Sequence, residues 1–112
     1  MKRILVVDDD VAMGSAVRDV IEALGFSPIL CGGGGEAVPR IGEFDALITD
    51  FLMPNGINGA ELAEIVKRLR PNMPVAIMSG TIDLIPKDHV ADKVFEKPFH
   101  IAELKEWLEK IG

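Results

Sequence analysis

Five short segments rich in apolar residues recur along the chain, and polar or charged residues follow four of them. The segments cover residues 4–7, 28–31, 46–49, 75–78 and 93–96. Runs of this length that are rich in β-branched residues are typical of strands, and continuous apolar character indicates strands that are covered on both faces. The pattern therefore predicts five buried strands.

The stretches between several of these strands have the periodicity of amphipathic helices instead. The apolar stripes are Met13, Val17, Val20, Ile21 and Leu24 in the first helix, Leu62, Ile65, Val66 and Leu69 in a later one, and Ile101, Leu104, Leu108 and Ile111 in the last. Gly25 suits a left-handed stop after the first helix. Asn58 and Glu61 have the spacing of a capping box.

Two connecting segments are less regular. The four glycines at 32–35 predict a flexible loop, and Pro39 should shorten or distort the helix expected around Glu36 to Ile41. Pro86 leaves room for only about one helical turn on either side within residues 82–92.

Strands that alternate with helices through short connections favour right-handed crossovers and a parallel sheet. We therefore expect an α/β fold with a single doubly wound sheet of five parallel strands and helices on both faces. A chain of 112 residues without an evident linker or repeat fits one domain, residues 1–112.

The charge balance narrows the class of protein. Eighteen acidic and twelve basic residues give a net charge of −6, which disfavours direct nucleic-acid binding because that needs clustered Lys and Arg. No apolar run approaches the length of a membrane span, and the run behind Lys2 and Arg3 stops at three aspartates, too early for a signal peptide. With one cysteine, these features predict a cytoplasmic protein without a membrane segment.

The strand ends carry the candidate chemistry. Asp8 and Asp9 follow the first strand, Asp50 the third, Ser79 the fourth and Lys97 the fifth. The carboxyl ends of parallel strands meet at one edge of a sheet, where ligands bind in this fold class. Clustered carboxylates repel each other and need either a cation or raised pKa values, and an all-oxygen set with few ligands suits Mg²⁺ over Ca²⁺. A carboxylate flanked by a metal, an ammonium and a hydroxyl is equipped to attack a phosphoryl group.

These residues stand in motifs that resemble the receiver domains of two-component response regulators. The matching pieces are Ile4-Leu5-Val6-Val7-Asp8-Asp9-Asp10, Asp50-Phe51-Leu52-Met53-Pro54, Met78-Ser79-Gly80 and Glu96-Lys97-Pro98-Phe99. The resemblance implies a flavodoxin-like strand order of 2-1-3-4-5 and a Lys97-Pro98 cis peptide bond.

The same resemblance implies the role of each site residue. Asp50 would be the phosphoacceptor, and Asp9, Asp50 and the backbone carbonyl of Leu52 would bind Mg²⁺, with Asp8 acting through water. Ser79 and Lys97 would contact the phosphoryl group. The donor would be a sensor histidine kinase or a histidine phosphotransfer protein. The domain would not be a conventional enzyme, since it would catalyse only its own phosphorylation and dephosphorylation. Its downstream target would be a protein, whose identity these motifs do not encode.

The sequence departs from the family pattern at three places. Val94 stands where the family commonly has an aromatic residue, the segment from Ser79 to Lys97 is about one helical turn short, and Pro39 follows the glycines. The first two departures affect the usual output face, so we expect a monomer that signals through contact with a different protein.

Other readings of the motifs remain open. They are a receiver module of a hybrid kinase or larger regulator, and a pseudo-receiver that only binds proteins. An aspartate phosphatase of the haloacid dehalogenase type would need further acidic residues after Lys97. A flavin binder would place three acids beside the FMN phosphate.

Overall fold

The computed structural model describes residues 2–54 and 56–111. Within them five strands form one parallel sheet in the order β2-β1-β3-β4-β5. The strands are β1 (Arg3–Val7), β2 (Ser27–Cys31), β3 (Ala46–Asp50), β4 (Val75–Ser79) and β5 (Lys93–Glu96). The predicted fold class and strand order are confirmed, and each strand lies within one residue of its predicted bounds.

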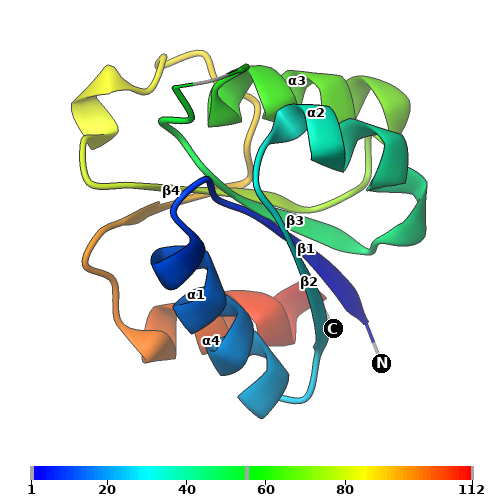
Figure 1. Ribbon diagram of the computed structural model, residues 1–112, viewed down its shortest axis with the longest axis vertical. Helices are drawn as coiled ribbons and strands as arrows, with labels where there is room; N and C mark the ends of the chain where they lie inside the picture. Colours follow the sequence, from blue (N-terminus) through cyan, green and yellow to red (C-terminus); the bar gives the residue numbers. More distant parts are fainter. Residues whose placement is uncertain (1, 55, 112) are drawn as a thin grey trace.

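Helices cover both faces of the sheet, as Figure 1 shows. The helices are α1 (Val11–Ala23), α2 (Gly34–Ala37), the 3-10 helix η1 (Val38–Glu43), α3 (Gly59–Leu69), the 3-10 helix η2 (Ile82–Leu84) and α4 (Ile101–Ile111). Helices α1 and α4 lie on one face, and α2 and α3 lie on the other. No helix among the described residues is long and apolar enough to cross a membrane.

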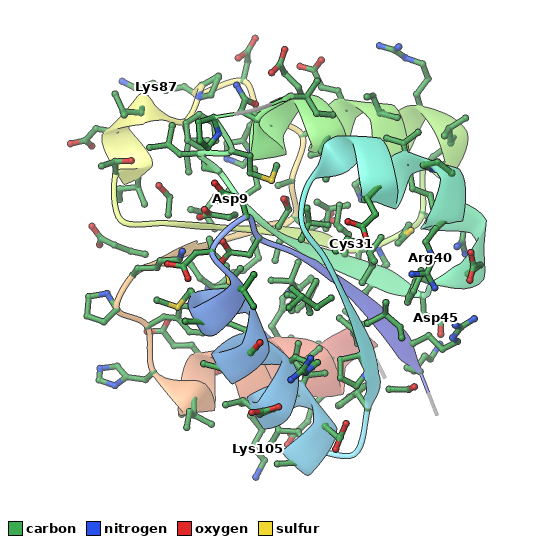
Figure 2. All side chains as sticks on the ribbon, in the orientation of Figure 1. Asp9, Cys31, Arg40, Asp45, Lys87 and Lys105 are labelled. Atoms are coloured by element: carbon green, nitrogen blue, oxygen red, sulfur yellow. The ribbon has the colours of Figure 1, made fainter. Side chains whose placement is uncertain are left out.

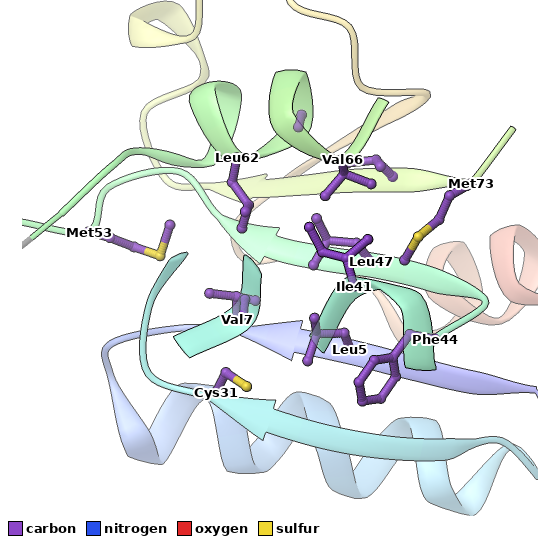
Figure 3. Close-up of a cluster of buried hydrophobic side chains, with 13 residues drawn as sticks. Leu5, Val7, Cys31, Ile41, Phe44, Leu47, Met53, Leu62, Val66 and Met73 are labelled. Atoms are coloured by element: carbon purple, nitrogen blue, oxygen red, sulfur yellow. The ribbon is translucent and has the colours of Figure 1, made fainter. Parts of the chain in front are cut away.

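Alternate residues of the central strands point into two separate cores. Leu5 and Leu47 pack toward α3 and η1 with Phe44, the cluster drawn in Figure 3. Ile4 and Ile48 pack toward α1 and α4 on the other face. Because both faces of β1 and β3 are covered, residues 4–7 and 46–48 are all apolar, and the charged residues Arg3 and Asp50 stand at the ends of these strands.

Local sequence fixes the ends of the helices. Asp10 caps α1 by accepting a hydrogen bond from the Met13 backbone N–H at 3.1 Å, and Gly25 follows this helix with a φ of +93°. The capping box of α3 is present, with bonds of 2.9 and 2.8 Å between Asn58 and Glu61. The predictions for Gly25 and for the capping box of Asn58 and Glu61 are confirmed, whereas the cap formed by Asp10 was not predicted.

Three positions of the predicted apolar stripes are exposed instead. Leu69 is 61% exposed at the last residue of α3, and Ile101 is 59% exposed at the first residue of α4. Met13, in the first turn of α1, is 39% exposed. All three lie at helix ends, where they escape the burial that the middle turns receive against the sheet.

The glycine run also differs from its prediction as a flexible loop. Gly34 and Gly35 form the start of α2, and Gly34 is buried. A β-carbon on Gly34 would come within 2.6 Å of the Cγ1 atom of Ile57, which lies just before α3. The start of α2 can therefore approach Ile57 this closely only because Gly34 has no side chain. As expected from Pro39, α2 is short and continues as the 3-10 helix η1.

Candidate functional site

Parallel pairing brings four of the strand ends to one edge of the sheet. Val7 of β1 pairs with Thr49 of β3, and Asp50 pairs with Met78 of β4. Ser79 in turn pairs with Glu96 of β5. The residues that follow each pair therefore meet at the carboxyl edge, where Figure 2 labels Asp9 at the turn between β1 and α1.

Three carboxylates come together at this edge. One oxygen each of Asp8, Asp9 and Asp50 lies within 4.8 Å of the other two. Asp10 lies outside this cluster, since its side chain caps α1. Oxygen ligands at this spacing suit a hard divalent cation such as Mg²⁺.

The Asp8 carboxylate is buried, with 1% of the residue exposed. Its Oδ1 atom accepts a hydrogen bond of 2.9 Å from the Asp10 backbone N–H. Its Oδ2 atom is buried without a hydrogen-bond partner among the described residues. Burial, more than the nearby negative charge of Asp50, raises the pKa of Asp8. A buried charged oxygen without a partner is costly, and a cation bound here would relieve that cost.

Lys97 supplies a positive charge at the cluster. Its ammonium donates a hydrogen bond of 3.1 Å to Asp50 Oδ1, and both side chains are more than four-fifths buried. The same nitrogen lies 3.8 Å from Asp8 Oδ2, which is within the range of an ion pair but too far for a hydrogen bond. One ammonium does not balance three carboxylates, so the site keeps an excess of negative charge.

The backbone holds Lys97 in place. Its N–H donates a hydrogen bond of 2.8 Å to the Ser79 carbonyl, which continues the pairing of β4 and β5. The Lys97-Pro98 peptide bond is cis, as the resemblance implied.

Ser79 is 2% exposed, and its hydroxyl bonds within its own turn. Its Oγ accepts a hydrogen bond of 2.9 Å from the Thr81 backbone N–H and lies 3.2 Å from the Thr81 hydroxyl. Thr81 was not singled out from the sequence. The sequence does carry a signal for it, namely two hydroxyl residues at positions i and i+2 after a strand. This spacing favours a turn that is closed by a hydrogen bond from the backbone to a side-chain hydroxyl.

Gly59 is a second residue that sequence reasoning missed. It is the first residue of α3, and its N–H donates a hydrogen bond of 2.9 Å to the Phe51 carbonyl. A β-carbon at this position would overlap the backbone carbonyl of Asp50. The lack of a side chain therefore lets α3 pack against the segment that positions Asp50. Leu52 follows that segment with its side chain 51% exposed.

An apolar groove of about 200 Å³ adjoins the carboxylates on the side of α1. Met13 and Val17 form one wall, and Pro98 and Phe99 lie opposite with the first turns of α4. Lys97 lines the groove and also contacts Asp50, so this one side chain connects the groove to the acidic cluster.

A doubly wound sheet of this order, with clustered aspartates and a lysine at its carboxyl edge, defines the receiver class of signalling domain. Residues 4–109 match the family model described as the response regulator receiver domain. The chain belongs to this family and is a receiver domain of two-component systems.

Individual relatives agree with this assignment. The chain is 33% identical over 117 residues to the response regulator receiver protein CpdR of Brucella abortus, covering 99% of this chain and 97% of that protein. It is also 33% identical to the DNA-binding transcriptional regulator NtrC of a Bradyrhizobium species. That match covers 90% of this chain, which spans only 22% of that relative's length.

A solved structure with the same fold is that of the response regulator TrrA of Thermotoga maritima in complex with Mg²⁺-BeF. It is 28% identical, the match covers 100% of both chains, and the TM-score is 0.91. Receiver domains in general interact with histidine kinases and downstream targets and are not conventional enzymes.

Proposed function

We propose that Asp50 accepts a phosphoryl group from a phosphohistidine on a sensor histidine kinase or a histidine phosphotransfer protein, with Mg²⁺ as cofactor. One observation carries this proposal. One oxygen of the Asp50 carboxylate lies within 4.8 Å of the acidic pair Asp8 and Asp9, and the ammonium of Lys97 is 3.1 Å from Asp50 Oδ1, at the edge where the strands end. A nucleophilic carboxylate needs positive charge nearby to approach an anionic phosphoryl group, and Lys97 together with a cation bound at the acidic pair would supply it.

In the transfer, an Asp50 carboxylate oxygen forms a bond to phosphorus while the bond from phosphorus to the donor imidazole nitrogen breaks. The electron pair of the broken bond stays with the imidazole, so atoms and charge balance. The Lys97 ammonium, already beside Asp50, pairs with the phosphoryl oxygens as they approach. Ser79 donates its hydroxyl hydrogen to one of these oxygens.

Asp9, Asp50 and the Leu52 backbone carbonyl would bind Mg²⁺ directly, and Asp8 would do so through water. Mg²⁺ supplies the positive charge that three carboxylates and a phosphoryl group require in addition to Lys97. The Asp8 Oδ2 atom, which has no hydrogen-bond partner among the described residues, and the raised pKa of Asp8 support a cation at this place.

The groove beside Lys97 supports a protein as the phosphoryl donor. A helix of the partner that packs its apolar face on Met13, Val17 and Phe99 would hold a histidine close to Asp50, because Lys97 lines both places. The net charge of −6 favours a protein partner over nucleic acid. The proposal places this exchange in the cytoplasm, and the buried single cysteine, Cys31, is compatible with that compartment.

Phosphorylation by a small acyl-phosphate donor with Mg²⁺ tests the proposal, with intact-mass spectrometry as the readout. Wild type should gain one phosphoryl group, and Asp50→Asn should gain none. Asp19→Asn is the matched control, because Asp19 is an exposed aspartate of α1 away from the cluster. Labelling of Asp50→Asn at the wild-type level would refute Asp50 as the acceptor.

A further inference from the structure

The hydroxyl groups of Ser79 and Thr81 form a pair at the end of β4, with their oxygens 3.2 Å apart, and Met78 just before them pairs with the proposed acceptor Asp50. Ser79 is buried, whereas Thr81 is exposed. Distance alone leaves either oxygen as the donor of this hydrogen bond. The direction of the bond matters, because Ser79 has one hydrogen to give and a phosphoryl oxygen can only accept.

Counting hydrogens decides the direction in the unphosphorylated protein. The Thr81 backbone N–H already donates to the Ser79 oxygen at 2.9 Å. If the Thr81 hydroxyl also donated to the Ser79 oxygen, none of the side-chain hydrogen bonds of the described residues would provide an acceptor for the buried Ser79 hydrogen. A buried donor without a partner is costly, whereas the exposed Thr81 hydroxyl can give its hydrogen to water. Ser79 therefore donates to Thr81.

We infer that Thr81 is a positioning residue that holds the Ser79 hydrogen away from Asp50, and that phosphorylation reverses the hydrogen bond between the two hydroxyls. This inference rests on the proposed function of Asp50. In the phosphorylated protein, Ser79 turns its hydrogen to a phosphoryl oxygen, and Thr81 changes from acceptor to donor. The contact between the two oxygens survives, so the turn after β4 keeps its shape while the hydrogen changes direction.

The reversal predicts an unusual effect of removing the Thr81 hydroxyl. Thr81→Val keeps the branched shape and the backbone N–H but leaves the buried Ser79 hydrogen without an acceptor in the unphosphorylated protein. In the phosphorylated protein the same variant loses only one hydrogen bond donated to Ser79. Since an unpartnered buried donor costs more than an acceptor with one bond fewer, the variant should favour the phosphorylated state.

Calorimetric titration with beryllofluoride in saturating Mg²⁺ measures this preference on the intact protein. We expect Thr81→Val to bind the phosphate mimic about three- to tenfold more tightly than wild type. Thr81→Ser restores the hydroxyl and should bind like wild type. Thr81→Ala removes the hydroxyl in a second way and should also bind more tightly, so the test stands even if Thr81→Val fails to fold.

A second background separates this role from a merely structural one. In Ser79→Ala there is no serine hydrogen to hold, so adding Thr81→Val should leave the affinity of that variant unchanged. Unchanged or weaker binding by both Thr81→Val and Thr81→Ala, with normal binding by wild type, would overturn the inference and leave the proposed function intact. Failure of wild type itself to bind the mimic would overturn both.

Discussion

Replacing Asp8 with asparagine should stabilise the protein when Mg²⁺ is absent. The change removes one charge from the cluster but keeps an oxygen that can accept the 2.9 Å bond from the Asp10 backbone N–H. The neutral amide also removes the negative charge from the Oδ2 position, which is buried without a hydrogen-bond partner among the described residues.

The magnitude follows from the distances. At an effective dielectric constant of about 20, the attraction between Asp8 and Lys97 at 3.8 Å is ~4 kcal/mol, and each repulsion from Asp9 or Asp50 within 4.8 Å is ~3 kcal/mol. Two repulsions together with the burial of the charge exceed one attraction, even when the exposed Asp9 is discounted for solvent screening. We expect Asp8→Asn to raise the metal-free stability by about 2 kcal/mol, or the melting temperature by roughly 5–10 °C.

The effect should depend on pH in one direction. Since the pKa of Asp8 is raised on folding, its ionised form destabilises the folded state at pH values above that raised pKa. As the pH falls through the raised pKa, Asp8 binds a proton in the folded state and the penalty disappears. The stability advantage of the variant should therefore be largest at pH values above the raised pKa of Asp8 and should vanish below the ordinary value of 3.8.

Melting curves with and without Mg²⁺ make the test complete. At ten times its Kd, Mg²⁺ should stabilise wild type by ~1.4 kcal/mol, and Asp8→Asn should lose most of this response. Asp19→Asn, at an exposed position of α1, should match wild type in both conditions. A variant that is less stable than wild type without metal, or one that responds to Mg²⁺ as wild type does, would refute the reasoning.

Three further predictions use the same site. Lys97→Ala should still accept phosphate, but more slowly, and it should lose the binding of any partner selective for the phosphorylated form; wild-type partner binding in a pull-down would contradict this role. Gly59→Ala should cost about 1–3 kcal/mol in urea unfolding, because a β-carbon overlaps the Asp50 carbonyl, whereas Gly35→Ala, which meets no atom, should cost less than 1. Light scattering on a gel-filtration column should find a monomer with and without beryllofluoride, because among the described residues the 3-10 helix Ile82–Leu84 is the only helix between β4 and β5. A dimer formed on adding the mimic would show that this short connection suffices for dimerisation.

Much of the fold could be predicted because its causes are local. The apolar runs set the strands, and the capping box of Asn58 and Glu61 sets the start of α3 with atoms only three residues apart. Leu69 and Ile101 were misjudged because periodicity gives the face of a helix but not how far its ends extend beyond the sheet.

The site could be predicted only in part, for a similar reason. Asp8, Asp50 and Lys97 follow strand ends, and strand order alone brings them to one edge. The close fit of Gly59 against Asp50, and of Gly34 against Ile57, depends on distances between segments that come together only on folding. No periodicity in the sequence records such a fit.

The two open edges of the sheet bear on the behaviour of the protein at high concentration. An exposed edge strand can pair with a strand of another molecule and begin aggregation. In β2, the Ser27 N–H donates a hydrogen bond to the Lys2 carbonyl, toward β1. Successive N–H groups along a strand point in opposite directions, so the next one would point away from the sheet. That position is occupied by Pro28, which has no N–H. At the other edge, β5 has only four residues, and its end residues Lys93 and Glu96 are charged and exposed. Edge-to-edge pairing is thus disfavoured on both sides of the sheet.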